Sequence, residues 1–477
     1  MNWSRVLKWR YSDIASYSFL ILLLVWAVVY AKARILISDP AFYFFNIVND
    51  ADYFVPHTRT TAIITQVPLV WAAKMHLPLA MLLNIYSVSF VLVRVVYFFL
   101  VNNVLKNKAA GFAVIAVSSI GIVESYFRPT SESNLALLNS ILLYAWLVFI
   151  DSKKLKKIPE MILGIGGTIV LVFFGYVSHS IALFSLLFVL FYFSFEYRKF
   201  KTPFPYVTVV FTLLVFMYHV FFGSKDTGHN NLYGNLLVSP FTILDELNTY
   251  YPYKFFFRHI NAIFIPYLVM LVVSVFVLFY KKKWWNGSFL VVFSVAYFIV
   301  ACTSFKEGDS NMEMEKIFLP LTMFAALSFV AAFRYYSGKV QLGLGVLAAG
   351  LVVTGLIIIK PSSSPYAKRI DTIQEVFVDA ANKQENRKLV IGLKDIEPYP
   401  MVGCWAFGIE TLVLSTIDKN MEPLTIFLDQ GYSDIEGNMK EPDNFMPALF
   451  QTSMNYSRLN KYYFNLPDQP YIRWRPR

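Results

Sequence analysis

Charged residues are scarce in this chain. Asp, Glu, Lys and Arg make up 15% of its 477 residues, and 57% are hydrophobic, whereas a soluble globular protein carries about 25% charged residues. Long apolar runs separate the few charges, so much of the chain must be solvated by lipid. The composition therefore predicts an α-helical polytopic membrane protein.

Metal-ligand and nucleotide motifs are also missing. The two cysteines, Cys302 and Cys404, have no zinc spacing with the histidines, and no HExxH or Walker sequence occurs. These absences disfavour a zinc hydrolase and transport driven by ATP bound to this chain. The net charge of +11 lies mostly between apolar runs, where it indicates membrane topology, and we expect no nucleic-acid partner.

About eleven apolar runs approach the roughly 20 residues that a membrane span needs. The first lacks a small-residue cleavage site and is longer than a signal-peptide core, so we expect it to stay as a span. A shorter run, 61–73, predicts an interfacial or re-entrant helix. The expected spans are 14–36, 79–103, 109–125, 134–150, 160–177, 180–196, 205–222, 260–280, 288–304, 317–334 and 341–359.

The basic residues set the orientation. Clusters precede the first span and follow every second one, so all lie in the cytoplasm if the N-terminus does. Lys32 and Arg34, at the opposite end of the first span, are the exception. The clusters are Arg5, Lys8 and Arg10; Lys106 and Lys108; Lys153, Lys154, Lys156 and Lys157; Arg198, Lys199 and Lys201; Lys281, Lys282 and Lys283; and Arg334 and Lys339.

The composition changes after Lys360. The stretch PSSSP, 361–365, predicts a short linker, and the polar remainder contains a helix-like segment, 371–384, and strand-like segments, 388–393 and 424–428. The sequence thus predicts two domains, a membrane domain over 1–360 and a small α/β domain over 361–477. With an odd number of spans, this second domain is periplasmic. The lack of secretory disulfides favours a bacterial inner membrane.

The first outer loop, about 37–78, holds the most informative polar residues. Asp39 follows the first span, and Asp50, Asp52, His57 and Arg59 come after it. A carboxylate can remove a proton from an acceptor hydroxyl, and cations can stabilise a phosphate leaving group. The alternative interpretation is an ordinary solvated loop.

Further candidates lie in the other outer loops. Lys316 is at the membrane interface, where a lipid phosphate or a simple anchoring role would suit it. Glu124 and Arg128 are either functional or a structural salt bridge, and His179 is either a ligand contact or a helix-end residue. The full set is Glu124, Arg128, His179, Glu313, Glu315 and Lys316.

Three sequence features together resemble the GT-C superfamily of integral-membrane glycosyltransferases. SDPAFYFF, 38–45, resembles the acidic start of the family's first outer loop, and HTRTTAIITQVPLVWAAKMHLP, 57–78, its helical return. EKIFLPL, 315–321, resembles the pattern before a late span. The resemblance covers residues 14–359 and does not assign the C-terminal domain.

The resemblance implies transfer of a sugar from a polyprenyl-phosphate-linked donor to a glycan, lipid or protein acceptor at the periplasmic face. Asp39 would be the catalytic acid of the loop, with Asp50 as a second acid. Lys316, Arg59 and His57 would bind the donor phosphate. Pro40 stands where many relatives carry Glu, and some members use a divalent cation such as Mg or Mn while others do not, so a metal held by Asp39 and Asp50 stays open.

Two other functions remain as alternatives. One is a lipid-linked glycan flippase or a non-catalytic membrane subunit of an envelope complex. The other is a polysaccharide polymerase or ligase of another fold. A flippase needs charges along a central cavity at mid-span depth, whereas the charges here gather in the outer loops.

Overall fold

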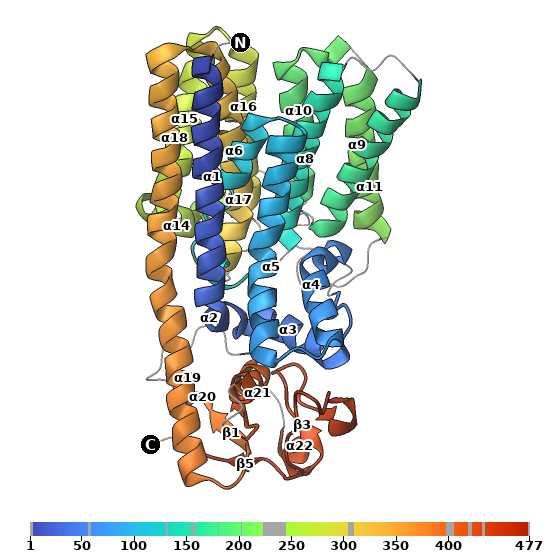
Figure 1. The fold of residues 1–477 in the computed structure, drawn as a ribbon, viewed down its shortest axis with the longest axis vertical. Helices are drawn as coiled ribbons and strands as arrows, with labels where there is room; N and C mark the ends of the chain where they lie inside the picture. Colours follow the sequence, from blue (N-terminus) through green and yellow to red (C-terminus); the bar gives the residue numbers. More distant parts are fainter. Residues whose placement is uncertain are drawn as a thin grey trace.

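Most of the chain is helical. The computed structural model describes residues 3–55, 59–129, 132–153, 158–179, 181–201, 203–222, 245–303, 310–396, 405–417, 422–431 and 435–475. Long helices run side by side, and a small domain containing the strands lies beyond one end of them (Figure 1). The N-terminus lies at the other end of the bundle.

The first part of the chain contributes two long helices and a group of short ones near the small domain. Its elements are α1 (Trp3–Val29), α2 (Ala31–Ile35), α3 (Ser38–Asp50), the 3-10 turn η2 (Thr60–Ala62), α4 (Ile63–Lys74), α5 (Leu79–Phe99) and the π-helical η3 (Leu100–Val104).

The middle of the chain forms the next group of helices. They are α6 (Lys108–Ala116), α7 (Glu124–Phe127), α8 (Glu132–Lys153), α9 (Ile158–Ser178), α10 (Ala182–Glu196), η4 (Lys199–Lys201) and α11 (Pro203–Phe222). Of these, α8 packs against α9, α10 and α6.

The last helices of the bundle surround α17. They are η5 (Leu247–Thr249), α14 (Tyr251–Arg258), η6 (Ile260–Phe264), α15 (Ile265–Tyr280), α16 (Trp284–Cys302), α17 (Asn311–Ala332), η7 (Phe333–Tyr335) and α18 (Gly338–Ile359). Nearly every residue of α17 is buried, because α15, α6, α16, α7 and α10 all pack on it.

Within the described residues, six helical segments are long and apolar enough to cross a membrane. They are Leu79–Val104, Glu132–Lys153, Ile260–Tyr280, Trp284–Cys302, Asn311–Tyr335 and Gly338–Lys383. The chain is therefore a helical protein with the character of a membrane protein, as its composition predicts. Helices also occupy most of the other predicted ranges, and shorter apolar helical stretches of 10–17 described residues lie at Asp13–Val29, Ile162–Ser178 and Ala182–Glu196.

The C-terminal domain contains a small parallel sheet. Strand β1 (Lys388–Gly392) pairs in parallel with β2 (Thr425–Asp429) on one side and with β5 (Ile472–Arg473) on the other. The predicted strands 388–393 and 424–428 are confirmed. The other elements are α20 (Leu393–Ile396), α21 (Phe407–Ile417), α22 (Glu436–Lys440), η9 (Tyr456–Arg458) and the antiparallel pair β3 (Asn444–Phe445) and β4 (Met454–Asn455).

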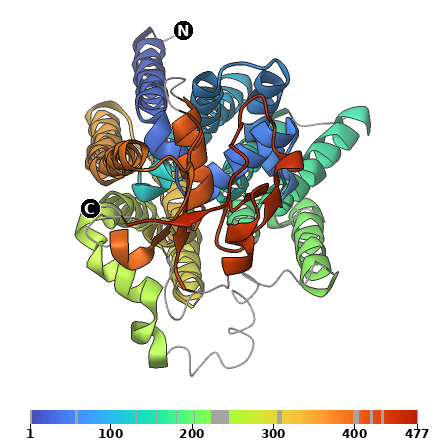
Figure 2. The ribbon, with the colours of Figure 1, turned by 90° about the horizontal axis from the view of Figure 1, so that it is seen from below.

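The predicted linker at 361–365 is wrong. These residues form the 3-10 turn η8 (Lys360–Ser362) and the start of α19 (Ser363–Lys383), so α18 continues into α19 as one long rod that reaches the C-terminal domain (Figure 1). Both prolines, Pro361 and Pro365, lie at the junction and in the first turn of α19, where a helix tolerates a missing N–H. Seen from below, the C-terminal domain covers the end of the bundle (Figure 2).

Two predicted span limits also need correction. The first long helix ends at Val29 rather than near 36, and residues 31–35 form the separate helix α2. Arg34 in α2 is 1% exposed and donates hydrogen bonds to the carbonyls of Tyr126 and Ser87. This burial explains why Arg34 breaks the pattern of basic clusters. The predicted span 109–125 is helical in α6 only to Ala116.

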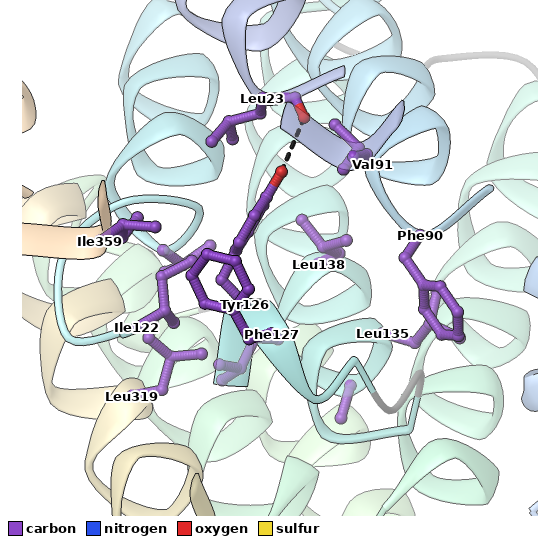
Figure 3. Packing of buried hydrophobic residues seen from close by; sticks show 14 of the residues in the cluster. Leu23, Phe90, Val91, Ile122, Tyr126, Phe127, Leu135, Leu138, Leu319 and Ile359 are labelled. Carbon is purple, nitrogen blue, oxygen red and sulfur yellow. Dashed lines mark hydrogen bonds between the residues drawn. The ribbon is translucent and has the colours of Figure 1, made fainter. Parts of the chain in front are cut away.

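Tyr126 lies at the centre of the packing near these short helices. Its hydroxyl donates to the carbonyl of Leu23 in α1 at 2.7 Å, and apolar side chains from α5, α8, α17 and α18 surround it (Figure 3). A buried tyrosine normally needs such a partner for its hydroxyl. The Arg34 guanidinium lies 4.4 Å from the centre of the same ring, so Tyr126 ties α1, α2 and α7 together.

Gly355 in α18 gives a test of this packing. A Cβ added there would lie 2.5 Å from the carbonyl oxygen of Ser119, whereas one added at Gly350 of the same helix meets nothing within 4 Å. We expect Gly355→Ala to lower the free energy of unfolding by about 1–3 kcal/mol through overpacking. Gly350→Ala should instead raise it by about 0.5–1 kcal/mol through the helix preference of Ala.

Thermal unfolding of the two purified variants in the same detergent checks this prediction. Equal melting temperatures would mean that α18 does not approach the turn after α6 as closely as the structure shows.

Candidate functional site

A buried ion pair between α19 and α21 holds the start of α3. The guanidinium of Arg369 contacts the carboxylate of Glu410, and both side chains are at most 2% exposed. Arg369 also donates to the carbonyl of Leu36 at 2.8 Å, and Glu410 accepts the backbone N–H of Ser38 at 2.7 Å. We call these four residues the α3 clamp.

The α3 clamp fixes an unusual backbone turn. Ser38 has a φ of 43°, in the left-handed region that residues other than glycine seldom adopt. The bond from its N–H to Glu410 stabilises that conformation. Because Asp39 is the next residue, in the first turn of α3, its direction depends on this turn.

Asp39 is partly buried among charged side chains from three parts of the chain. The charged side chains that act most strongly on it are Lys316 and then Arg128, followed by Glu313 and Glu132. Burial raises the pKa of the Asp39 carboxyl, and the two cations oppose that rise. The structure therefore brings together Asp39 and Lys316, which the sequence placed 277 residues apart.

Lys316 and Glu313 lie one turn apart at the start of α17. Lys316 Nζ is 2.7 Å from Glu313 Oε1, and the Lys316 side chain is 9% exposed. A lysine that only anchors a helix in the headgroup layer would extend its ammonium into water. The burial of this ammonium beside two carboxylates favours a site over an anchor.

Glu315 has a different role from its neighbours. Its carboxylate accepts the backbone N–H groups of Val123, Glu124 and Ser125 at 2.8–2.9 Å. A carboxylate suits these N–H groups at the start of α7, since the helix itself leaves them unpaired. Glu315 therefore positions the turn that carries Arg128.

Arg128 directly follows α7 and is 6% exposed. Within the described part of the chain, its Nε has no hydrogen-bond partner and no carboxylate lies within 4 Å of it in an ion pair. The predicted alternative, a Glu124–Arg128 salt bridge, does not form, because Glu124 binds Asn311 at 2.9 Å and Tyr366 at 3.4 Å. A buried guanidinium whose Nε has no hydrogen-bond partner among the described residues is suited to bind an anion.

Glu132, which the sequence did not single out, joins Arg59 to this site. It is 2% exposed at the start of α8, accepts from the Tyr43 hydroxyl at 3.5 Å and lies 3.9 Å from Arg59 Nη1. Burial, Glu132 and Asp39 raise the pKa of Tyr43 far above its usual value, so this tyrosine stays a hydrogen-bond donor. Tyr43 is four residues after Asp39, a helical spacing that places both on one face.

The structure does not bring the remaining candidates to Asp39. Asp50 is exposed at the other end of α3, 11 residues and thus roughly 16 Å along the helix. Asp52 is exposed and accepts its neighbour's N–H. His179 accepts the N–H of Ile181 in a local turn, and His57 lies outside the described residues.

These positions do not suit a divalent cation held by Asp39 and Asp50. Their separation along α3 is far greater than one ion's coordination sphere allows. The described residues also contain no cluster of three or more His, Cys, Asp or Glu side chains arranged to hold a metal. The cations beside Asp39 are Lys316 and Arg128, which already supply positive charge.

An apolar pocket of about 640 Å³ follows α15 and α16. Most of its lining is aliphatic or aromatic and includes Phe256 and Phe298. Both rings contact Phe318, with centroids 5.1 Å and 5.8 Å away. Phe318 is two residues after Lys316 in α17, so the pocket and the Lys316 ammonium lie on different sides of that helix.

Comparison with known proteins adds no assignment. No family model, curated protein or solved structure matches this chain.

The α3 clamp generates a stability prediction. Glu410→Leu leaves the Arg369 guanidinium buried without its carboxylate, and we expect a loss of about 3–5 kcal/mol in the free energy of unfolding. Adding Arg369→Met to Glu410→Leu should recover part of that loss, since the double variant buries no unpaired charge. Thermal unfolding in detergent measures both variants.

Arg473→Met is the matched control. It breaks exposed ion pairs with Asp429 and Glu436 in the same domain, and such pairs contribute about 1 kcal/mol or less. A loss in Glu410→Leu no larger than in Arg473→Met would contradict the structural role of the clamp.

Proposed function

We propose that this chain is a GT-C-type integral-membrane glycosyltransferase. It moves a sugar from a polyprenyl-phosphate-linked donor to an acceptor at the periplasmic face of a bacterial inner membrane. The observation that carries the proposal is the placement of Asp39, a carboxylate with a raised pKa, beside the buried cations Lys316 and Arg128. The sequence resemblance to the superfamily points the same way.

Each candidate residue has a separate role in the proposed reaction. Asp39 accepts the proton of the acceptor hydroxyl, the acceptor oxygen bonds to the anomeric carbon, and the bond from that carbon to the phosphate oxygen breaks. Lys316 and Arg128 stabilise the charge that develops on the leaving phosphate. Arg59, held near Glu132, adds a third cation.

The apolar pocket suits the donor's lipid. A polyprenyl tail needs an apolar surface that opens to the bilayer, and the pocket along α15 and α16 ends near Phe318 in α17. The donor would then pass around α17, because Phe318 and Lys316 project from different faces of that helix.

The proposal also includes the number of membrane spans and their orientation. It has about eleven spans, a cytoplasmic N-terminus and a periplasmic C-terminal domain. The arrangement in Figure 1 supports this, because the N-terminus and the C-terminal domain lie at opposite ends of the bundle. Asp39 lies at the end that faces the C-terminal domain.

One observation favours the alternative of a lipid-linked glycan flippase. Arg94 lies inside the segment Leu79–Val104, is 6% exposed, and its Nη1 has no hydrogen-bond partner among the described residues. A charge inside a span is often functional. A flippase of this kind would move a lipid-linked glycan across the membrane without forming a glycosidic bond.

Asp39→Asn tests the enzyme directly. Reconstituted chain is supplied with a panel of polyprenyl-phosphate sugars labelled in the sugar, together with membrane extract as the acceptor source. We expect wild type to transfer label and Asp39→Asn to lose transfer by at least about 100-fold, as removal of a general base does. Flippase activity without transfer in wild type would refute the proposal.

The pH dependence gives the same test a second readout. Asp39 must be ionised to act as a base, so kcat/KM should fall on the acid side with an apparent pKa above the usual Asp value, since burial raises it. Lys316→Met removes the cation that most lowers the Asp39 pKa. The fall in kcat/KM at acid pH should therefore move to still higher pH. If the fall in kcat/KM moved to lower pH in Lys316→Met, Asp39 would not be the base.

The two buried cations give a separate prediction about the donor. Arg128→Met should lower kcat/KM for the labelled donor by about 10–100-fold, the range for one lost charge-assisted hydrogen bond. Lys254→Met is the matched control, since Lys254 is an exposed cation of α14. Equal effects of the two substitutions would mean that Arg128 does not contact the phosphate.

A further inference from the structure

Four aromatic rings meet where α3 faces the C-terminal domain. Phe42 of α3 lies 5.4 Å from Trp405, 5.4 Å from Phe450 and 5.5 Å from Phe54 between ring centroids. Trp405 and Phe450 are 4.9 Å apart. We call this group the aromatic platform.

The aromatic platform is open to solvent. Phe450 is 67% exposed, although it is a large apolar side chain, and the other three rings are partly buried. A single exposed phenylalanine needs no explanation, whereas Phe450 continues into three partly exposed rings, which together form an aromatic surface suited to a ligand.

The backbone holds the exposed half of the platform in place. Leu449 donates its N–H to the carbonyl of Trp405 at 2.9 Å, and Ile409 donates to Pro447 at 3.1 Å. A Cβ added to Gly408 would lie 2.1 Å from the carbonyl oxygen of Met446, so the two segments are in direct backbone contact. The rings of Trp405 and Phe450 are therefore positioned before any ligand arrives.

Phe54, on the bundle side of the platform, is held in place by α4. The amide of Gln66 in α4 accepts the N–H of Phe54 at 2.9 Å and donates to its carbonyl at 2.6 Å. Phe54 also contacts Tyr43, with centroids 5.5 Å apart, and Tyr43 bonds Glu132. The aromatic platform thus continues into the charged site without a break.

The distance from the platform to Asp39 is one helical turn. Phe42 and Tyr43 follow Asp39 by three and four residues, so their Cβ atoms lie about 5–6 Å from that of Asp39. A pyranose ring resting on Phe42 would place one of its hydroxyl groups within reach of the Asp39 carboxylate.

We propose that the aromatic platform binds a pyranose ring of the acceptor, which makes the acceptor a saccharide. This inference rests on the proposed function, because it assigns the acceptor's place beside Asp39. A pyranose has C–H groups on its faces and hydroxyl groups at its edge. The C–H groups pack on the negative faces of aromatic rings, and the hydroxyl groups pair with Glu132, Tyr43 and Asp39.

The polar edge argues for a saccharide rather than a lipid. A lipid chain would gain nothing from the carboxylate of Glu132 or the hydroxyl of Tyr43. Trp405 and Phe450 also belong to the C-terminal domain, which lies beyond the ends of the long helices (Figure 1).

Saturation-transfer difference NMR on the full chain in nanodiscs tests the proposal. The probes are neutral tetrasaccharides of the cello-, malto- and chito- series. We expect at least one to receive saturation at its ring C–H protons and its dissociation constant to rise about tenfold in Phe450→Ala and in Trp405→Ala. Trp405→Phe keeps an aromatic ring and should bind almost as wild type, which separates lost stacking from lost folding.

Two controls make the outcome specific. Tyr462→Ala removes another exposed ring of the same domain, 64% exposed and packed on His76, and should leave binding unchanged. Tetrasaccharide binding is measured without a donor, so a wild-type chain that binds a tetrasaccharide but transfers no sugar would refute the enzyme and keep the platform, and the two failures are distinguishable.

Three results would overturn the proposal. One is the absence of saturation transfer to every tetrasaccharide, and another is equal binding in wild type and both alanine variants. The third is quenching of Trp405 fluorescence by brominated lipid, measured as the difference between wild type and Trp405→Phe, since that would place the platform in the bilayer interface.

Discussion

The buried pair of Arg369 and Glu410 is the interaction on which the site depends. Removing two charges from water costs several kcal/mol per ion, and their mutual attraction offsets that cost only when the remaining donors and acceptors are satisfied. Here the carbonyl of Leu36 and the N–H of Ser38 satisfy part of the pair. The pair is therefore stable only when α3, α19 and α21 are together, which makes the C-terminal domain and the bundle depend on each other.

The acidic residues near the bundle end fall into two groups with different roles. Glu410 and Glu315 each bind backbone N–H groups and hold a short segment in place. Asp39 and Glu132 instead face cationic side chains. The first two carboxylates fix the turns that carry Ser38 and Arg128, and the other two lie among the charged side chains of the candidate site.

The sequence predicts what depends on local pattern. The apolar runs predict the long helices because their length and composition alone meet the demands of a bilayer, and two short apolar runs, 388–393 and 424–428, predict β1 and β2. The linker prediction at 361–365 failed because proline at the start of a helix is compatible with helix. Arg34 does not fit the pattern of basic clusters because it is buried and binds backbone carbonyls, so its position does not indicate which side of the membrane it is on.

The candidate site was only partly predictable. Asp39, Arg128 and Lys316 were recognisable as charges at span ends, but their convergence depends on how α3, α7 and α17 pack. Glu132 was overlooked because an acid at the start of a span is usually solvated. The contacts of Glu410 with Ser38 and of Trp405 with Phe42 join residues more than 350 positions apart, and no local pattern in a single sequence indicates them.

The short helix α3 connects these features. Its first residue is bound by the α3 clamp, its first turn carries Asp39, and its next turn carries Phe42 of the aromatic platform and Tyr43 of the Glu132 pair. A rigid helix keeps these side chains at fixed separations, so a movement of the C-terminal domain would turn all of them together. Because α18 and α19 form one rod, such a movement must also bend or tilt a membrane-spanning helix. The geometry between the carboxylate of Asp39 and the aromatic platform is therefore set by the membrane helices as much as by the domain that covers them.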